Sequence, residues 1–486
     1  MTPEPGSSTT SLPGHSGGEG KSTVAPPRSR PAPGIRAGDA QPFAMSPMQK
    51  RIWLAHHRVP ASGHCNVQRV LRLCGRLDVA RLARSLNALV RRHESLRTAF
   101  PAHGETQVAQ RTAVLELPTT DLAGLRPDER DAAIRRLAHE DARQPFDLTR
   151  APLLRTRLVR LGDDEHVLLF AVHNIVCDGW SLGILFRELA AAYGTGTGDA
   201  IPDPAPPIQY ADYTEWRRQR CDDDATARSI AYWKSGLADL PPALRWPDGF
   251  ATATDLDGAR RIDYLASPIA DAVAILSRRA SVTPFAVLLA AFLVLLRLRS
   301  GREDLLVGTP IAGRQHLETR SVVGLFVDML VIRCDLAKRP SFVDLVRRLH
   351  ATLTEAVDHQ DVPFQRLVEE LDPENGPHGL PFFDIVINHT GDRQRIPARW
   401  GDLVVEDIDV DAVSSTFALT LFVRDEGRLK LALVHRTAVL TTDAAKALLD
   451  DYQHLLRRAC ADPQRSIDDL APFAPESGAE PRGHAT

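Results

Sequence analysis

The segment HNIVCDG, residues 173–179, brings together side chains that could carry out acid–base chemistry. The imidazole of His173 could accept a proton near neutral pH. The neighbouring carboxamide of Asn174 can donate and accept hydrogen bonds, but it cannot remove a proton. Asp178 and Gly179 are typical of tight turns, and a purely structural role is the simpler interpretation of both. The segment therefore indicates either a catalytic turn or a turn that lacks its base.

The segments on either side show how this turn must be positioned. The continuous apolar run HVLLFAVH, 166–173, predicts a strand that is buried on both faces. The following SLGILFRELAAAY predicts a helix, with Ser181 as its N-cap. A ligand at this junction would meet free backbone N–H groups and the positive end of a helix dipole. Because side chains alternate along a strand, His173 should face the lobe interior if Asn174 faces a cavity.

Composition excludes several classes of function. The 486 residues carry 59 Lys and Arg against 62 Asp and Glu, a net charge of −3, which argues against nucleic acid or an anionic membrane as the main partner. The six cysteines are widely spaced and none forms a CxxC pair, so we expect no metal site and reduced thiols. The beginning of the chain has no basic-then-apolar signal pattern, and we expect a cytoplasmic protein.

The order of strand-like and helix-like segments predicts an α/β protein with two lobes. The Pro-, Gly- and Ser-rich residues 1–40 and the final 473–486 should be disordered tails. Between them we expect an N-terminal lobe over 41–222 and a C-terminal lobe over 223–472, with a cleft between the two. The run TPFAVLLAAFLVLLRLR, 283–299, predicts a buried helix with Thr283 as N-cap and Pro284 as its first residue. It is too short to span a membrane.

The chain resembles the condensation domains of nonribosomal peptide synthetases over about residues 42–470. The resemblance is carried by segments that follow one another in the family's order: SPMQKRIWL (46–54), RHESLRTAF (92–100), HNIVCDGWS (173–181), YADYTEW (210–216), VGTPIAGR (307–314), VGLFVDMLVIR (323–333), HQDVPFQRL (359–367) and LPFFDIVINH (380–389). Eight such segments in order make the resemblance specific.

The resemblance implies a fold and a set of partners. The fold would be two chloramphenicol-acetyltransferase-like lobes in a V-shaped pseudo-dimer around a central substrate tunnel. Donor and acceptor carrier proteins, acting in trans, would insert their 4'-phosphopantetheine arms from opposite faces. No cofactor would be bound by the domain itself. We expect a monomer without nucleic-acid or membrane partners.

The resemblance also assigns roles to residues. In the family's His-His-x-x-x-Asp-Gly signature the second histidine is tied to catalysis, and here that position is Asn174. The catalytic candidates are then Asn174, His173 as a substitute base, and Gly179. The resemblance further implies an ion pair between Asp178 and Arg314 of the other lobe. The expected tunnel residues are Trp180, Ser181, Asp328 and Asn388. For Trp180 the simpler interpretation is that it packs in the core.

The resulting functional hypothesis is a free-standing condensation enzyme that forms an amide between a carrier-bound acyl or aminoacyl thioester and an amine. Loss of the base need not abolish this reaction, because acid–base terms contribute about 10²–10⁴-fold whereas proximity can contribute more. One alternative is a catalytically impaired domain that recruits a tailoring enzyme. Another is an ester-forming or small-molecule acyltransferase.

Overall fold

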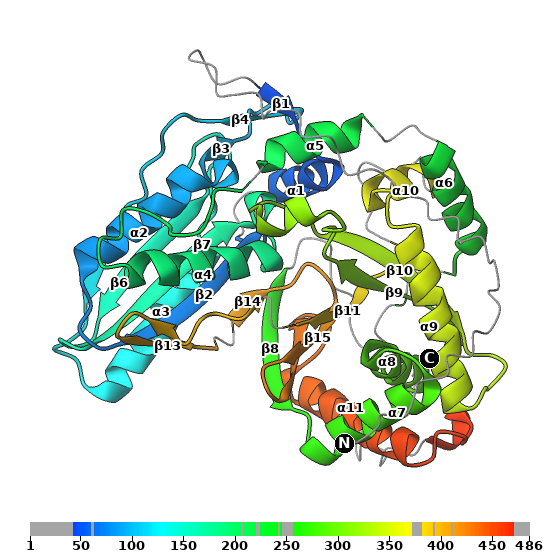
Figure 1. The fold of residues 1–486 in the computed structure, drawn as a ribbon. Helices are drawn as coiled ribbons and strands as arrows, with labels where there is room; N and C mark the ends of the chain where they lie inside the picture. Colours follow the sequence, from blue (N-terminus) through cyan, green and yellow to red (C-terminus); the bar gives the residue numbers. More distant parts are fainter. Residues whose placement is uncertain are drawn as a thin grey trace, which may run out of the picture.

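The computed structural model describes residues 42–59, 63–206, 208–219, 224–241, 244, 256–371, 382–391, 394–409 and 412–470. The expected disordered tails, 1–40 and 473–486, lie outside these residues. The described chain forms two α/β lobes that diverge from a shared junction, which gives the predicted V shape (Figure 1).

The N lobe is built on a six-stranded sheet with the strand order β12-β13-β2-β7-β6-β5. Its elements within the first half of the chain are β1 (Pro42–Ala44), α1 (Pro47–Arg58), β2 (Asn66–Cys74), α2 (Val79–Arg92), β3 (Thr98–Ala99), β4 (Thr106–Ala109), β5 (Thr119–Asp121), α3 (Pro127–Arg143), β6 (Leu154–Arg160), β7 (Glu165–His173), α4 (Gly179–Gly194) and α5 (Tyr210–Arg218). Short 3₁₀ turns lie at Glu94–Arg97 and Asn174–Val176. Strands β1, β4 and β3 form a separate small sheet.

Strand β7 lies at the centre of this lobe, paired antiparallel with β2 on one side and β6 on the other. Every residue from His166 to His173 is buried, as its continuous apolar run predicts. Helices α2 and α4 pack together over one face of the sheet, and α3 covers the opposite face. The central strand thus delivers the residues that follow His173 to a fixed position at the edge of the lobe.

The C lobe is built on a seven-stranded sheet with the order β10-β9-β11-β15-β16-β8-β14. Its elements are α6 (Asp224–Gly236), β8 (Asp257–Tyr264), α7 (Ser267–Ala280), α8 (Pro284–Ser300), β9 (Asp304–Ile311), β10 (Asp328–Asp335), α9 (Phe342–Asp358), α10 (Phe364–Leu371), β11 (Ile385–Thr390), β14 (Ala412–Ser414), β15 (Leu419–Asp425), β16 (Leu429–Arg436) and α11 (Thr442–Ala461). Two 3₁₀ turns lie at Leu317–Ser321 and Ile467–Leu470.

Helix α8 forms the centre of the C lobe, as its apolar sequence predicts. Thr283 caps it by accepting a hydrogen bond from the backbone of Ala286, and Pro284 is its first residue. All residues from Ala286 to Leu296 are buried among α7, α9 and α11. Among the described residues no single helix is long and apolar enough to cross a membrane, although α7 and α8, bent by 110°, meet that criterion as a pair.

One segment departs from the expected lobe boundary. Strands β12 (Arg399–Trp400) and β13 (Leu403–Asp407) fall in the second half of the sequence, yet β13 pairs antiparallel with β2 and extends the N-lobe sheet. The side chain of Trp400 is fully buried in the N-lobe core. The chain then returns to the C lobe at β14. The assignment of all of 223–472 to one lobe was therefore wrong for this excursion, in which the chain crosses to the N lobe and back (Figure 1).

Candidate active site between the lobes

The HNIVCDG segment forms a compact junction between β7 and α4. Strand β7 ends at His173, one 3₁₀ turn covers Asn174–Val176, and Asp178 begins α4. The Asp178 carboxylate accepts a hydrogen bond from the backbone N–H of Ser181 at 2.7 Å. Asp178 is therefore the N-cap of α4, and the prediction that Ser181 caps this helix was wrong. Aspartate accepts this bond more strongly because it is charged.

His173 points away from the cavity and into the N lobe. Its side chain is fully buried, and its Nε2 lies 3.3 Å from Nδ1 of His56. Its Nδ1 accepts the backbone N–H of Ile175 at 3.2 Å. Burial, with further contributions from His56 and His64, holds the pKa of His173 well below its usual range. The residue is a neutral interior histidine, so the structure does not favour its expected role as a substitute base.

Asn174 is placed on the wall of a cavity between the lobes. Its backbone N–H donates to the carbonyl of Cys65 at 2.8 Å, which fixes the position of the residue. Its side chain is half-buried and lines the cavity. The carboxamide makes no hydrogen bond to any residue that the structure describes, so its oxygen and nitrogen are both available to a bound molecule.

Asp178 and Arg314 form the ion pair between lobes that the resemblance implies. The guanidinium Nη2 lies 3.3 Å from Oδ1 and 3.5 Å from Oδ2 of Asp178, and both side chains are buried. Oδ2 also accepts the backbone N–H groups of Phe326 at 3.0 Å and Val327 at 3.2 Å. One aspartate of the N lobe thus holds three groups of the C lobe.

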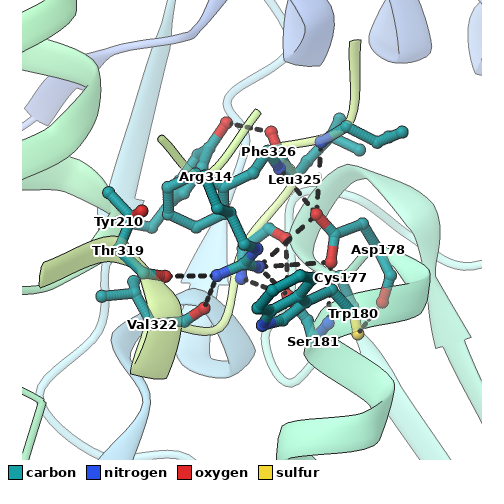
Figure 2. A network of polar contacts seen from close by, with 12 residues as sticks. Cys177, Asp178, Trp180, Ser181, Tyr210, Arg314, Thr319, Val322, Leu325 and Phe326 are labelled. Atoms are coloured by element: carbon teal, nitrogen blue, oxygen red, sulfur yellow. Dashed lines mark hydrogen bonds and ion pairs between the residues drawn. The ribbon is translucent and has the colours of Figure 1, made fainter. Parts of the chain in front are cut away.

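Arg314 is anchored by several further contacts, which Figure 2 shows. Its Nη1 donates to the carbonyl of Val322 at 2.7 Å and to that of Thr319. Its Nη2 donates to the Ser181 hydroxyl at 2.7 Å, and the guanidinium lies 3.9 Å from the ring centroid of Phe326. The cation is therefore enclosed by carbonyls, a carboxylate and an aromatic face. We call Asp178, Ser181, Arg314 and the Gly324–Val327 backbone the inter-lobe network.

Ser181 belongs to this network and not to the cavity. The residue is fully buried, and its hydroxyl donates to the carbonyl of Gly324 at 2.9 Å. The same hydroxyl accepts the Gly324 N–H at 3.0 Å. The prediction of Ser181 as a tunnel residue was wrong, because all of its hydrogen-bonding capacity is used between the lobes.

Gly179 lines the cavity at the first residue of α4, where another side chain lies directly against it. A Cβ at this position would lie 2.9 Å from Oε1 of Gln394 and 3.1 Å from its Nε2. Glycine therefore allows the Gln394 amide to lie against the start of the helix. Sequence reasoning did not identify Gln394, which belongs to no segment that carries the resemblance.

The remaining expected tunnel residues divide into two groups. Trp180 and Asn388 both border the cavity, and the indole Nε1 of Trp180 donates to the carbonyl of Arg320 at 3.1 Å. Asp328 is instead buried beside Arg217 and accepts the backbone N–H groups of Met329 and Phe364. Burial raises its pKa, an effect that Arg217 opposes. Since Asp328 lies outside the cavity lining, its placement as a tunnel residue was wrong.

Two other histidines of the resembling segments, His359 and His389, are also separated. His389 lines the cavity, and its ring stacks against that of Phe285. His359 follows α9, lies 3.0 Å from the Ser229 hydroxyl and stacks on Tyr232, apart from the cavity lining. His389 is therefore the histidine that shares a cavity with Asn174.

The cavity has a volume of about 770 Å³, which is enough for an extended acyl chain together with a small acceptor. One wall is the strand β2 and the turn after β7, and the other is the open face of the C-lobe sheet. The part of the chain that the structure describes contains no group of three or more His, Cys, Asp or Glu side chains arranged to hold a metal ion. The site offers positioning and hydrogen bonds from protein side chains.

Comparison with known proteins identifies a family profile and a curated relative that both match most of this chain. The sequence profile described as "Condensation domain" matches residues 40–478. A linear gramicidin synthase of Brevibacillus parabrevis is 37% identical over 429 residues, which is 87% of this chain and 8% of that protein. The chain thus spans less than a tenth of this curated relative.

Two solved structures show a similar fold. The X-domain from teicoplanin biosynthesis superimposes with a TM-score of 0.80 at 25% identity, covering 90% of this chain and 99% of that one. The X-domain in its complex with OxyB, also from teicoplanin biosynthesis, gives a TM-score of 0.77 at 24% identity, covering 90% of this chain and 98% of that one.

Proposed function

Because this chain belongs to the condensation-domain family of nonribosomal peptide synthetases, we propose that it forms an amide bond between a carrier-bound acyl or aminoacyl thioester and an amine. The observation that carries the proposal is the placement of Asn174. Its carboxamide lines the cavity and makes no hydrogen bond to any described residue, and the turn that bears it is held by the inter-lobe network. The hydrogen-bonding position of the signature is therefore kept, although its titratable group is absent.

The proposed reaction needs orientation more than proton removal. The neutral amine attacks the thioester carbonyl, the carbon–sulfur bond breaks, and the amine proton leaves with the thiol or through water. An α-amine has a pKa of about 8, so a useful fraction is already neutral near pH 7. The Asn174 oxygen can accept an N–H of the amine and its nitrogen can donate to the developing oxyanion. Holding both substrates close together in one cavity supplies the remaining rate acceleration.

The proposed partners are donor and acceptor carrier proteins. Their 4'-phosphopantetheine arms would bring the thioester and the amine into the cavity between the lobes, and these arms are substrates and not a resident cofactor. Asn174, Gly179, Gln394 and Asn388 would contact the reacting groups, and Trp180 would border them.

The test is intact-protein mass spectrometry of a condensation reaction. A donor carrier loaded with an acyl thioester is mixed with a loaded acceptor carrier or a free amine, and Asn174→Ala, Asn174→Asp and Asn174→His are compared with the wild type. Product with the wild type and at least about tenfold less with Asn174→Ala is the expected result. Asn174→His should add a base, with a rate that rises with pH between about 5.5 and 7.5.

A second candidate function is recruitment of a tailoring enzyme by a catalytically silent domain. The observation that favours it is the lack of a titratable side chain at position 174 combined with the likeness to the X-domain, which was solved in a complex with OxyB. Product with Asn174→His but none with the wild type, for every substrate pair, would support recruitment. Stable co-elution with an oxygenase on size-exclusion chromatography, unchanged by Asn174→Ala, would establish it.

A further inference from the structure

Three arginine residues line the cavity, and two of them lie on the open face of the C-lobe sheet. Along β15, Phe422 and Arg424 line the cavity, whereas Leu421 and Val423 belong to the hydrophobic core on the helix side. Arg260 of β8 lines the same wall, and Arg69 of β2 lies on the N-lobe side of the cavity. Three guanidinium groups from both lobes therefore border one space.

The carboxylates nearby do not balance these cations. Asp407 lies 3.9 Å from Arg69, at the limit of an ion pair. Asp409 lies 3.6 Å from Arg260, and it also accepts a hydrogen bond from Lys430 at 2.6 Å. A third carboxylate, Glu426, lies 3.8 Å from Lys430. The described part of this wall therefore has four cations against three carboxylates, an excess of one positive charge.

Arg424 makes no ion pair with any residue in the described part of the chain. Its Nε is buried without a hydrogen-bond partner, and Lys430, directly opposite on β16, is another cation. Burial, together with the repulsion of Arg69 and Arg260, lowers the pKa of Arg424 to about 10. The attraction of Asp407 and Glu426 opposes this lowering of the pKa, but neither carboxylate lies within ion-pair distance of Arg424. The group remains charged at neutral pH, and a partly desolvated cation without an ion pair is costly unless an anion binds to it.

We propose that Arg424, with Arg69 and Arg260, forms a subsite for a free carboxylate on the substrate. This proposal rests on the proposed function and names its substrate class: an acyl or amine partner that carries an anionic group remote from the reacting carbon. Asn66 lies opposite His173 in the β2–β7 ladder, and Arg69 follows three residues later. At about 3.3 Å per residue, the subsite lies roughly 10 Å along β2 from the Asn174 turn.

The phosphate of the carrier arm is the other source of an anion. The whole pantetheine chain separates that phosphate from the thioester, so an arm extended with its thioester at Asn174 would carry its phosphate beyond the subsite. We therefore assign the subsite to the substrate carboxylate, and the experiment separates the two sources.

The test is isothermal titration calorimetry of the full chain with synthetic acyl-pantetheine probes that lack phosphate. Suberoyl-pantetheine, an eight-carbon chain that ends in a carboxylate, is compared with its neutral suberamoyl counterpart. The carboxylate probe should bind about tenfold more tightly, as expected for a charge-assisted pair in a partly buried site. Succinyl-pantetheine is too short to reach the subsite, so it should gain little over its own amide.

Arg424→Gln should abolish the preference for the carboxylate, and Arg69→Gln should reduce it. Arg457→Gln, on the exposed surface of α11, is the matched control and should leave the preference unchanged. Thermal unfolding checks that each variant is folded, and the comparison of two probes on the wild type needs no variant. Equal affinity for the suberoyl and suberamoyl probes, or no binding of the suberoyl probe, overturns the subsite.

A third probe, octanoyl-phosphopantetheine, is compared with octanoyl-pantetheine to test the other source. If octanoyl-phosphopantetheine binds more tightly than octanoyl-pantetheine, and Arg424→Gln removes this difference, the three arginines bind the phosphate of the carrier arm. That result would overturn the proposal that they bind a substrate carboxylate. Product from neutral substrates with no carboxylate preference would refute the subsite alone. Carboxylate preference without any product would refute the proposed catalysis alone.

Discussion

The inter-lobe network and the cavity wall lie on the two sides of the same turn, and they differ in how fully their polar groups are paired. Asp178, Ser181 and Arg314 are buried, and together they make at least eight hydrogen bonds or ion contacts at the junction of the lobes. Only Nε of Arg314 has no hydrogen-bond partner there among the described residues, and the charge of this guanidinium is balanced by Asp178. On the cavity side, Asn174 has no side-chain partner among the described residues, and Arg424 has no ion pair there. Buried polar groups are normally satisfied, so unsatisfied ones on a cavity wall indicate a site for a ligand.

This difference in pairing distinguishes the residues of the HNIVCDG segment that hold the structure from the residue that could take part in the chemistry. Both the aspartate and the glycine of HNIVCDG are present: Asp178 caps α4 and joins the lobes, and Gly179 is the first residue of that helix. The base is absent, but the residue in its place lies on the cavity. A substitution at position 174 should therefore change reactivity with little effect on folding, whereas a substitution at 178 should do the reverse.

The largest expected effect comes from Asp178→Ala. The change leaves the Arg314 guanidinium buried without its counter-ion and removes the acceptor of the Phe326, Val327 and Ser181 N–H groups. Breaking a buried pair by removing one partner costs about 3–5 kcal/mol, and we expect a loss of this size in the free energy of unfolding. Urea denaturation followed by circular dichroism measures it.

The control is the double variant Asp178→Ala with Arg314→Met. Removal of both charges should cost less than the sum of the two single changes, because neither charge is then left alone. A single-variant loss below about 1 kcal/mol would contradict the view that this network joins the lobes.

The second prediction concerns the interior side of the turn, where His173, His56 and His64 lie together. Burial lowers the pKa of all three, that of His64 to about 4. The unfolded chain binds protons near pH 6.5 and the folded one does so only at lower pH. These three neutral histidines should therefore make their full contribution to the free energy of unfolding above about pH 6.5. That contribution should be lost as the pH drops toward 4, so the protein becomes less stable.

Urea denaturation at about pH 7 and about pH 5 tests this dependence. The variant His64→Gln should reduce the loss between the two values, whereas a change at the exposed His454, as His454→Gln, should leave it as in the wild type. A wild-type stability that is constant over this range would show that these histidines accept protons in the folded protein.

The sequence predicted the parts of this arrangement that depend on local pattern. The apolar run of β7 and the capped helix α8 follow from neighbouring residues. His173 and Asn174 do face different surroundings, but strand alternation is not the cause, because β7 ends at His173 and Asn174 begins a 3₁₀ turn. The Asp178–Arg314 pair came from the resemblance alone. Ser181 was assigned as N-cap because serine is a common cap, but the charged Asp178, three residues earlier, occupies that position.

Other features depend on contacts between distant parts of the chain. Residues Leu403–Asp407 have the pattern of an ordinary short strand, and no local feature shows that they pair with β2 in the other lobe. Alternation along β15 places Phe422 and Arg424 on one face of the strand. It does not show that this face borders a cavity shared with Asn174, and so the arginine cluster and Gln394 were missed.

The smallest expected effect on stability comes from Asn174→Ala. This variant gives the most direct test of the difference between the inter-lobe network and the cavity wall. The backbone N–H of this residue bonds to Cys65 and is unaffected by the change, while the side chain has no partner to lose among the described residues. We expect a change within about 0.5 kcal/mol in the free energy of unfolding, measured by urea denaturation beside Asp178→Ala. A loss above about 1.5 kcal/mol would mean that the carboxamide supports the fold, and its position on the cavity would then be no evidence of a chemical role. An unchanged stability together with lost product in the condensation assay would place the function of this turn in a single side chain, because the surrounding scaffold would be intact.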